Sequence, residues 1–586
     1  MRAVVVLLAI TAIAHASPQS SPGWSRYELL CAPCHGTRGD GRGPAAAYSR
    51  GEPRDFTRGA FEWRTTPFGA PASDADLATT IRFGARGTSM PAFGDVLGDR
   101  DIAEMIAIVR AFAPNVPNVS DVKSQHAIAL AAEPTATTNG AAVWAHAGCA
   151  SCHGDDGRGN RALADPPYDL TREPLRRPRE HDAPADRRRA AAWSIATGMT
   201  GTAMPGFPTA DVWALADYVV ALNANAHDDR MAMGSAKLAV GTWPGVDPDD
   251  ATIFGSAVPP QGAAPASLAP VEASLSARQC ARCHAKQARE WQPSLHAGAT
   301  SVGYRARLAD GVDATNCARC HAPLAEQQTD AQLASEAVQC ASCHVRNWTR
   351  RGPATLAPSL QTLPNYPFAA SAIYERADFC MTCHQLPPSS AVAGKPLLDT
   401  YKEWLEGPYM RRGVQCQSCH MPNREHTWLG VHDPATLRQA YRLDARATHD
   451  RDAIRVDVEL ANVGAGHDFP TTATPAIYVV IELLDGARVV GKFSQRIGRD
   501  IYWDGSWHER SDTRIPPGES LAISRVWHGR ATTARVTIEA HPDEYYEGLY
   551  ATRLGANPLA SSLYGAALQK ARGSHYIAET REIALP

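Results

Sequence analysis

The chain has 586 residues and a formal charge of −3. This length implies several domains rather than one, and the slightly acidic balance argues against a nucleic acid partner. Residues 1–16 begin with Met1-Arg2, continue as a mostly apolar run and end in Ala14-His15-Ala16, the pattern of a cleavable signal peptide. The run is too short to span a bilayer comfortably. We therefore expect a periplasmic or otherwise extracytoplasmic protein with no integral membrane segment after cleavage.

All 14 cysteines lie in seven Cys-x-x-Cys-His motifs. The cysteines are Cys31, Cys34, Cys149, Cys152, Cys280, Cys283, Cys317, Cys320, Cys340, Cys343, Cys380, Cys383, Cys416 and Cys419, and the histidines that follow each pair are His35, His153, His284, His321, His344, His384 and His420. Two thiols at this spacing can each form a thioether with a haem vinyl group, and the adjacent imidazole then binds the iron. A disulfide framework would not place a His after every second Cys, and zinc sites would pair two half-motifs. The motifs therefore predict seven covalently bound haem c groups.

The first two motifs belong to an internal duplication. A Met-Pro-x-Phe sequence occurs in both copies, at Met90 and at Met204, and a glycine-rich stretch follows each haem motif. Each copy resembles a class I cytochrome c domain, an all-α family in which a Met-Pro loop supplies the second axial ligand. This resemblance implies domains at residues 18–116 and 136–226, with Met90 and Met204 as distal ligands. Met105 and Met199 are weaker alternatives, and a core position is the usual role of a methionine.

A dense basic cluster lies between the copies, at residues 172–189. It is interpreted either as a solvated loop that balances haem propionates or as a docking patch for an acidic redox partner. Residues 227–275 are rich in Ala, Pro and Gly, which predicts a semi-extended linker.

Five motifs crowd into residues 276–440, too few residues to build a separate apolar core for each haem. We therefore expect a mostly α or irregular module with stacked haems. Its sequence contains Trp291-x-x-Ser294-x-His296, Trp404, Tyr409 and His426-x-x-x-Gly430-x-His432. These motifs resemble the multihaem cytochrome superfamily that includes the tetrahaem carrier of ammonia oxidisers, hydroxylamine oxidoreductase and ammonifying nitrite reductase. The resemblance implies that His296, His426 and His432 are distal iron ligands; the alternative is an ordinary surface or core His.

Residues 441–586 have no cysteine and are predicted to form a β-sandwich. Apolar and polar residues alternate from Ile454 to Leu460, residues 477–490 read as a hairpin, and further strands are expected at 520–527 and 534–539. A Gly-rich loop presents His467, and similar loops in sandwich domains of multihaem cytochromes carry a haem ligand. His467 is thus a candidate distal ligand. Five other histidines are much weaker candidates: His449, His508, His528, His541 and His575.

The five clustered haems have four good distal candidates, so one sixth position is filled by a less obvious residue, donated by a neighbouring molecule, or open. The leading interpretation is an electron carrier between a donor and an acceptor protein, with no catalytic residue. Met/His ligation raises haem potential relative to bis-His, so two higher-potential sites are expected beside a lower-potential row. Alternatives are an oxidoreductase acting on a small nitrogen or sulfur compound at a five-coordinate haem, or a subunit of a homo-oligomeric haem filament. No motif ends in Lys, which disfavours an ammonifying nitrite reductase.

Overall fold

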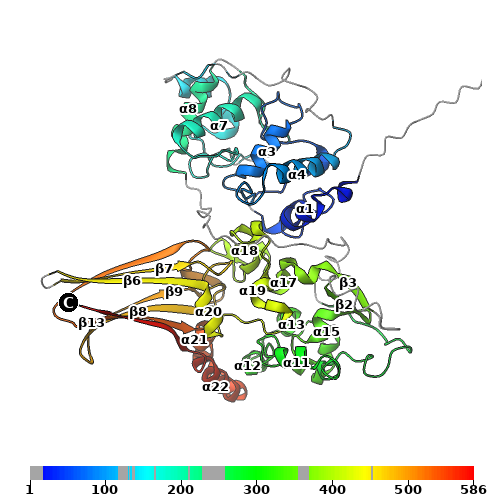
Figure 1. The fold of residues 1–586 in the computed structure, drawn as a ribbon, viewed down its shortest axis with the longest axis vertical. Coiled ribbons are helices and arrows are strands. Elements are labelled where there is room, and N and C mark those ends of the chain that lie inside the picture. The colour runs from blue at the N-terminus through cyan, green and yellow to red at the C-terminus, as the bar shows by residue number, and fades with distance from the viewer. Residues whose placement is uncertain are drawn as a thin grey trace, which may run out of the picture. The chain divides into compact units, whose positions relative to one another are not determined.

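The chain divides into two compact units, Met1–Asp229 and Arg230–Pro586 (Figure 1). The computed structural model describes residues 17–49, 51–116, 130, 132–134, 139–160, 162–163, 167–208, 211–226, 258–353, 368–450 and 453–585. The predicted signal peptide, residues 1–16, lies outside these ranges. Among the helices so described, none is both long and apolar enough to cross a membrane.

The first copy of the duplication is built from short helices around one helix crossing. Its elements are η1 (Pro18–Ser20), α1 (Trp24–Leu30), α2 (Ala32–His35), η2 (Ala46–Tyr48), η3 (Phe56–Arg58), α3 (Asp74–Phe83) and α4 (Asp99–Ala111). A Cβ atom at Gly23, just before α1, would lie 2.7 Å from Met105 Cε in α4, so the glycine permits the close approach of the two helices. Met105 is only 1% exposed and belongs to this core.

The second copy repeats the crossing. Its elements are α5 (Gly140–His146), α6 (Ala150–His153), α7 (Pro184–Thr197), α8 (Val212–Leu222) and η5 (Asn223–Asn225). A Cβ atom at Gly140 would meet the Ala214 carbonyl oxygen at 2.3 Å, so a glycine again allows the first helix to cross the last. Trp144, Trp213 and Leu215 are buried in the same core. In both copies the last helix therefore packs on the first, α4 on α1 and α8 on α5.

Buried arginines join the two copies. The Arg64 side chain is fully buried, and its Nη2 donates to the Thr197 carbonyl at 2.7 Å. Arg177 returns the contact, because its Nη2 donates to the Arg64 carbonyl at 2.7 Å. The guanidinium groups thus satisfy backbone carbonyls of the opposite copy, which would otherwise be buried without a partner.

Two arginines of the basic cluster at residues 172–189, Arg177 and Arg179, are buried, so the interpretations of the cluster as an exposed loop are wrong for them, whereas Arg172 and Arg189 are exposed. Besides Arg177, Arg179 is buried and donates to Asp182 at 2.8 Å. Arg188 donates to Asp217 at 2.6 Å and lies over the Trp213 ring. The arginines brace the second copy and its contact with the first.

The second unit begins with a haem module of short helices. They are α10 (Ala277–Cys280), α11 (Ala285–Trp291), α12 (Val302–Ala309), α13 (Ala314–His321), η6 (Ala325–Gln328), α14 (Ala331–Ser335), α15 (Cys340–His344), η8 (Ala372–Glu375), α17 (Ala377–His384), η9 (Pro388–Ser390), α18 (Thr400–Glu406), η10 (Met410–Arg412), α19 (Cys416–His420), η11 (Pro422–Arg424) and α20 (Pro434–Ala440). Two small sheets accompany them: β1 (Val345–Arg346), β2 (Thr349–Pro353) and β3 (Phe368–Ser371); and β4 (Ala391–Val392) with β5 (Lys395–Pro396).

The described part of the predicted linker, residues 258–275, packs on the haem module. Val258 forms a bridge with Leu324 and lies in one apolar cluster with Leu275 and Trp348. Trp348 Nε1 also donates to the Gly262 carbonyl at 3.1 Å. These contacts make residues 258–275 part of the module, while residues 227–257 lie outside the described chain.

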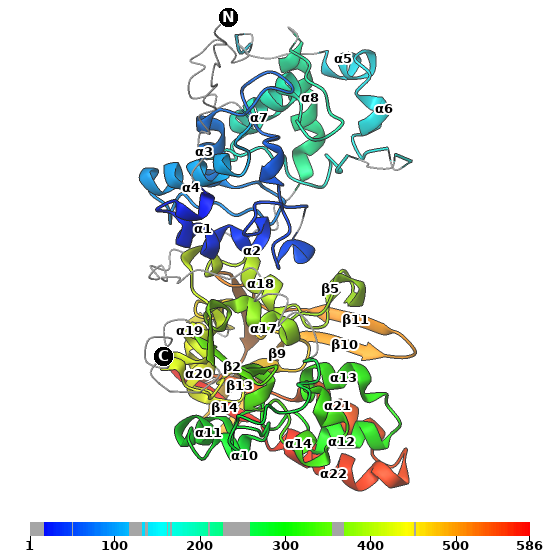
Figure 2. The same ribbon diagram turned by 90° about the vertical axis from the view of Figure 1, so that its right-hand side faces the viewer.

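The C-terminal residues form the expected β-sandwich. Its strands are β6 (Tyr441–Asp450), β7 (Ala453–Asn462), β8 (Ala476–Asp485), β9 (Arg488–Ile497), β10 (Arg499–Trp503), β11 (Trp507–Asp512), β12 (Ser520–His528), β13 (Thr533–His541) and β14 (Tyr576–Ala584). One antiparallel sheet has the order β12-β7-β6 and the other β14-β13-β8-β9. Strands β10 and β11 pair as a separate hairpin, which Figure 2 shows. Residues of both sheets, such as Val456 and Ile481, share one buried cluster.

Two helices of this C-terminal part were not expected from the sequence. They are α21 (Glu544–Arg553) and α22 (Pro558–Arg572), and they pack on α12 of the haem module. Tyr550, Tyr564 and Ala306 form the apolar contact. A Cβ atom at Gly303 would lie 2.0 Å from the Tyr550 hydroxyl oxygen, so a larger residue there would require Tyr550 to move. The sandwich is thereby attached to the haem module.

The sandwich core gives a stability prediction. Ile481 is fully buried between the sheets, so Ile481→Ala should lower the free energy of unfolding by about 2–5 kcal/mol through lost contacts and a cavity. Val490 is 44% exposed, and Val490→Ala should change it by less than about 0.5 kcal/mol. Chemical denaturation followed by circular dichroism measures both. Equal effects of the two substitutions would contradict the assigned core.

Candidate haem-binding sites

Each Cys-x-x-Cys-His motif lies on or beside a single helical turn. In α2, α6, α13, α15, α17 and α19 the motif histidine is the last helical residue, whereas α10 ends at Cys280 and α11 begins just after His284. Residues three and four apart share one face of a helix. The turn therefore directs both thiols and the imidazole toward the same side, as covalent attachment and ligation of one haem require.

Backbone carbonyls orient four of the motif histidines. His35 Nδ1 donates to Arg54 at 3.0 Å, and His420 Nδ1 donates to Leu429 at 2.6 Å. His321 and His344 make the same bond to Ala299 and Arg351, each at 2.7 Å. A carbonyl acceptor places the proton on Nδ1 and leaves Nε2 free to bind a metal.

Three motif histidines of the haem module face a second imidazole. The ring centres of His344 and His426 are 6.1 Å apart, those of His384 and His296 are 6.2 Å apart, and those of His420 and His467 are 6.3 Å apart. A metal–imidazole bond is about 2 Å long, so two rings that bind one iron from opposite sides have centres about 6.4 Å apart. The residues thus fit a haem iron between each pair, and three of the four predicted distal histidines lie where such a ligand is needed.

Burial keeps several of these rings neutral. It lowers the pKa of His296 to about 3 and the pKa of His344 to about 4. In the first cytochrome-like copy, burial also lowers the pKa of His35 to about 4. A neutral imidazole has the free nitrogen lone pair that iron requires.

His432, the fourth predicted distal ligand, does not face a motif histidine. Its Nε2 lies 3.1 Å from Asp543 Oδ2, at the start of α21. His284 and His321 have no second imidazole at ring-contact distance within the part of the chain that the structure describes; the only aromatic neighbour of His321 there is Tyr304, at 5.3 Å. Two of the five sites in the module therefore differ from the three paired ones.

Three tryptophans support the paired sites. Trp291 Nε1 donates to the Val338 carbonyl at 2.8 Å, and Trp404 Nε1 donates to the Val414 carbonyl at 2.9 Å. Each acceptor lies two residues before a haem motif, so each tryptophan fixes the approach to that motif. Trp428 was missed by sequence reasoning, although it lies within the His426–His432 motif; its ring is edge-on to His296 at 4.6 Å and to His426 at 5.4 Å.

Helices that carry different haem motifs contact one another. Helix α10 contacts α15, α13 contacts α17, and α17 contacts α19, which brings Cys280 near Cys340, Cys320 near Cys383 and Cys380 near Cys416. These contacts join the first module motif to the third, the second to the fourth, and the fourth to the fifth. The five attachment sites are therefore neighbours in space in an order that differs from their order in the chain.

The two Met-Pro loops have the same backbone structure. The amide of Ala85 donates to the Met90 carbonyl, and the amide of Met199 donates to the Met204 carbonyl, each at 3.0 Å. Gly84 and Gly198 both have φ of +64°, and a Cβ atom at either would lie 2.7 Å from the carbonyl oxygen of the loop methionine. This conformation, which favours glycine, places Met90 and Met204 at equivalent positions. The match extends the duplication from sequence to structure.

The two cytochrome-like copies differ in the hydrogen bonding of their motif histidines. His35 Nδ1 has the Arg54 carbonyl as its acceptor, whereas the buried His153 Nδ1 has no acceptor among the described residues. A hydrogen bond from Nδ1 raises the basicity of the ligand. The difference predicts unequal electronic properties at the two sites.

The five weaker histidine candidates are not paired with motif histidines. His541 and His575 stack on each other at 3.9 Å, and His508 stacks on Tyr502 at 5.1 Å. His449 and His528 lie on β6 and β12.

Comparisons with known proteins agree with this geometry. The cytochrome c family model matches residues 137–223, the model of subunit III of cbb3-type cytochrome c oxidase matches residues 18–108, and the model of cytochrome c554 and c-prime matches residues 279–345. No curated protein matches the chain.

Two solved structures overlap with it in part. The penta-haem cytochrome c552 from Thermochromatium tepidum is 18% identical, with a TM-score of 0.43 over 54% of this chain and 100% of its own. A chain of the reducing HAO-like protein complex from Kuenenia stuttgartiensis is 26% identical, with a TM-score of 0.29 over 34% of this chain and 94% of its own. Both scores are too low to support a functional comparison.

The family models and the Cys-x-x-Cys-His motifs together identify the chain as a multihaem c-type cytochrome.

The Met-Pro loops give a prediction that separates ligand from core methionine. Met90→Ala and Met204→Ala should each remove one high-potential centre from an optical redox titration, because the thioether that raises the potential is lost. Met105→Ala should leave both centres in place and only lower stability, since Met105 packs between α1 and α4. Retention of both centres in Met90→Ala and Met204→Ala would show that other residues bind the irons.

Proposed function

We propose that this protein is an extracytoplasmic heptahaem electron carrier that transfers electrons between a donor and an acceptor protein. Unit Met1–Asp229 would hold two Met/His sites, with His35 and Met90 in one and His153 and Met204 in the other. Unit Arg230–Pro586 would hold five sites on its five motif histidines. Bound haem iron takes up and releases one electron at a time.

The close packing of helices that carry different haem motifs supports this proposal. Helix α10 contacts α15, and α13 and α19 both contact α17, which leaves little room for separate protein walls between the sites. Cys343 of the third module motif also interacts electrostatically with Cys380 of the fourth, which links the two groups. An enzyme needs one such site, but a row of five adjoining sites is what conduction over a distance requires. The protein's own contribution is to hold the sites together and to shield them from water.

Ligand type supports a direction of flow. The proximal histidines of the module are opposed by imidazoles in three cases, whereas the first unit offers two Met-Pro loops. Methionine ligation raises haem potential relative to bis-His ligation. Electrons would therefore enter at the module and leave through the duplicated domains.

A second candidate function is favoured by the two unpaired sites. Among the described residues, no imidazole lies at ring-contact distance from His284 or His321. The Tyr304 ring lies beside His321. Tyr546 interacts electrostatically with Cys317 of the same haem motif and with Asp543, and Asp543 in turn lies beside His432. An open iron beside these polar groups would suit an oxidoreductase acting on a small nitrogen or sulfur compound, and a ligand from a second molecule would suit a filament.

Spectroscopy of the purified protein distinguishes these functions. For a carrier we expect seven haems per mature chain by mass spectrometry, two groups of potentials, and no change in the ferric spectrum on adding nitrite or hydroxylamine. A high-spin ferric signal perturbed by either compound would favour the oxidoreductase. A low-spin fraction that rises with protein concentration would favour assembly, and fewer than seven haems would contradict the proposed count.

A further inference from the structure

His467 is delivered to the haem module by the β-sandwich. It lies in the connection of residues 463–475 between the end of β7 and the start of β8, whose first part, residues 463–472, is called the His467 loop here. The His467 ring is nearly parallel to that of His420, with an interplanar angle of 13°. The two histidines thus come from different domains, and the distance between them depends on how those domains are held together.

The β-sandwich holds one side of the loop. Asn462 is fully buried, and its Nδ2 donates to the His467 carbonyl and to the Ile515 carbonyl, both at 2.9 Å. Phe469 and Ile515 exchange backbone hydrogen bonds of 2.8 and 2.9 Å. These bonds shape the loop within its own domain but do not attach it to the haem module.

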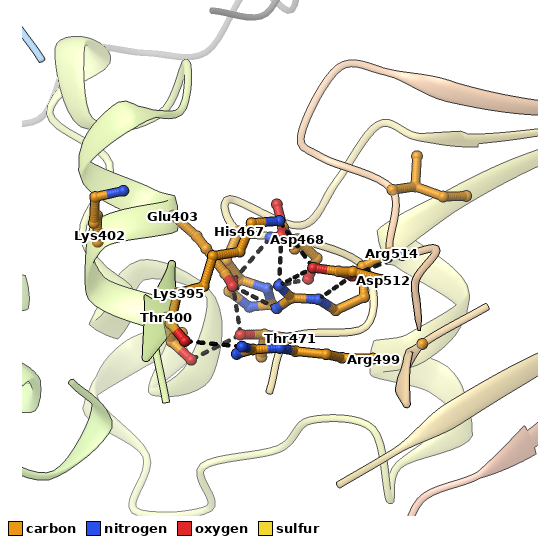
Figure 3. A network of polar contacts seen from close by, with 12 residues as sticks. Lys395, Thr400, Lys402, Glu403, His467, Asp468, Thr471, Arg499, Asp512 and Arg514 are labelled. Atoms are coloured by element: carbon orange, nitrogen blue, oxygen red, sulfur yellow. Dashed lines mark hydrogen bonds and ion pairs between the residues drawn. The ribbon is translucent and has the colours of Figure 1, made fainter. Parts of the chain in front are cut away.

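Glu403 of the haem module holds the other side (Figure 3). One of its carboxylate oxygens, Oε2, accepts from the Asp468 amide at 3.2 Å and from the Thr471 hydroxyl at 2.8 Å. The other oxygen, Oε1, accepts from Arg514 Nη1 at 2.6 Å. Every hydrogen bond that Glu403 accepts through its side chain thus comes from the His467 loop or from Arg514 of the β-sandwich.

Arg514 completes the connection from the β-sandwich. It forms a two-pronged pair with Asp512, with both N–O distances at 2.8 Å, and lies 3.3 Å from the Asp468 carboxylate. The Arg514 side chain is 1% exposed and that of Glu403 is 7% exposed. Solvent screening is therefore weak. Removal of Arg514 would leave the buried Glu403 carboxylate without its cation, which is strongly unfavourable, whereas removal of Glu403 would leave Arg514 paired with Asp512.

The helix that carries Glu403 also braces the haem motif of His420. Trp404, the next residue in α18, donates to the Val414 carbonyl two residues before Cys416. Its ring also contacts Gly466, since a Cβ atom there would lie 3.5 Å from Trp404 Cδ1. Tyr409 follows α18 and donates to the Val463 carbonyl at 3.0 Å. Helix α18 and the residues just after it thus contact both the segment before the haem motif of His420 and the His467 loop.

We propose that Glu403 and Arg514 are positioning residues that set the His467 loop against the haem module, so that α18 fixes the separation of the two imidazoles at the His420 site. The inference rests on the proposed role of His467 as an iron ligand. Neither Glu403 nor Arg514 touches the iron; both act through the loop. The β-sandwich is then a part of the redox site rather than an appended domain.

Ferric EPR spectra of the intact protein test the proposal. Glu403→Gln keeps the shape of the side chain and removes its charge, and it should convert one haem per chain from low-spin to partly high-spin while the haem content stays the same. Added imidazole should restore the low-spin signal. Cyanide binding at that haem should accelerate about tenfold or more, the factor expected when a hydrogen bond to a charged group is lost.

Glu509→Gln is the matched control. Glu509 forms a 2.7 Å pair with Arg499, another buried arginine of the same domain. Arg499 donates to backbone carbonyls of residues 392–396 in the haem module and not to the His467 loop. This substitution should lower thermal stability without changing any spin state. If Glu509→Gln produces the same high-spin signal, the effect is general loosening and the positioning role is wrong.

Two further variants separate the possible failures. His467→Ala should give a full high-spin signal at one haem; if it does not, the ligand assignment itself fails. Thr471→Val removes only the 2.8 Å hydrogen bond to Glu403 and the 2.7 Å contact with Thr400, so it keeps the protein folded if Glu403→Gln does not. If His467→Ala changes the spin state but Glu403→Gln and Thr471→Val change neither spin state nor cyanide binding, the positioning inference alone is overturned.

Discussion

A haem iron takes axial ligands from two opposite sides, and the chain can supply only one of them locally. The motif histidine follows directly from the attachment cysteines, but the second ligand has to be brought to it by folding. In the haem module this produces ring centres 6.1 to 6.3 Å apart for three pairs. Trp428 is edge-on to the rings of His296 and His426, two of the predicted distal ligands, and backbone carbonyls orient motif histidines such as His344 and His420. Many contacts in the module therefore hold these rings so that they face each other.

The β-sandwich has a clear place in this arrangement. It contacts the haem module through the apolar surface of α21 and α22 against α12, and again through the polar contacts of Glu403 and Arg514. The first contact buries apolar side chains and provides adhesion. The second is directional and lies beside His467. A loop held from both domains has little freedom to move, which suits the predicted role of His467 as an iron ligand.

In the first unit, each copy contains both its motif histidine and its predicted second ligand, the methionine of the Met-Pro loop. The Met-Pro loops repeat down to the backbone hydrogen bonds, because both copies have the same left-handed glycine beneath the loop. The copies are then joined by Arg64 and Arg177, whose guanidinium groups bond to carbonyls rather than carboxylates. Their role in the contact explains why a cluster of arginines lies in the segment between two cytochrome domains. Different hydrogen bonding at His35 and His153 distinguishes two sites that otherwise share one design.

The sequence alone determined the attachment sites, the duplication and the alternating strands of the sandwich. These features depend on local chemistry: thioether spacing covers one helical turn, the Met-Pro loops recur at a constant offset, and alternation such as Ile454 to Leu460 reports a strand with one buried face. The sequence also indicated His296, His426 and His467, since each lies in a motif. Only the tertiary structure decided which motif histidine each of them faces, that His432 lies beside Asp543 instead, and which motif helices contact one another. Those contacts join residues far apart in the chain, where spacing carries no information. The same holds for Glu403 and Arg514, which are ordinary charged residues until folding buries them together beside His467.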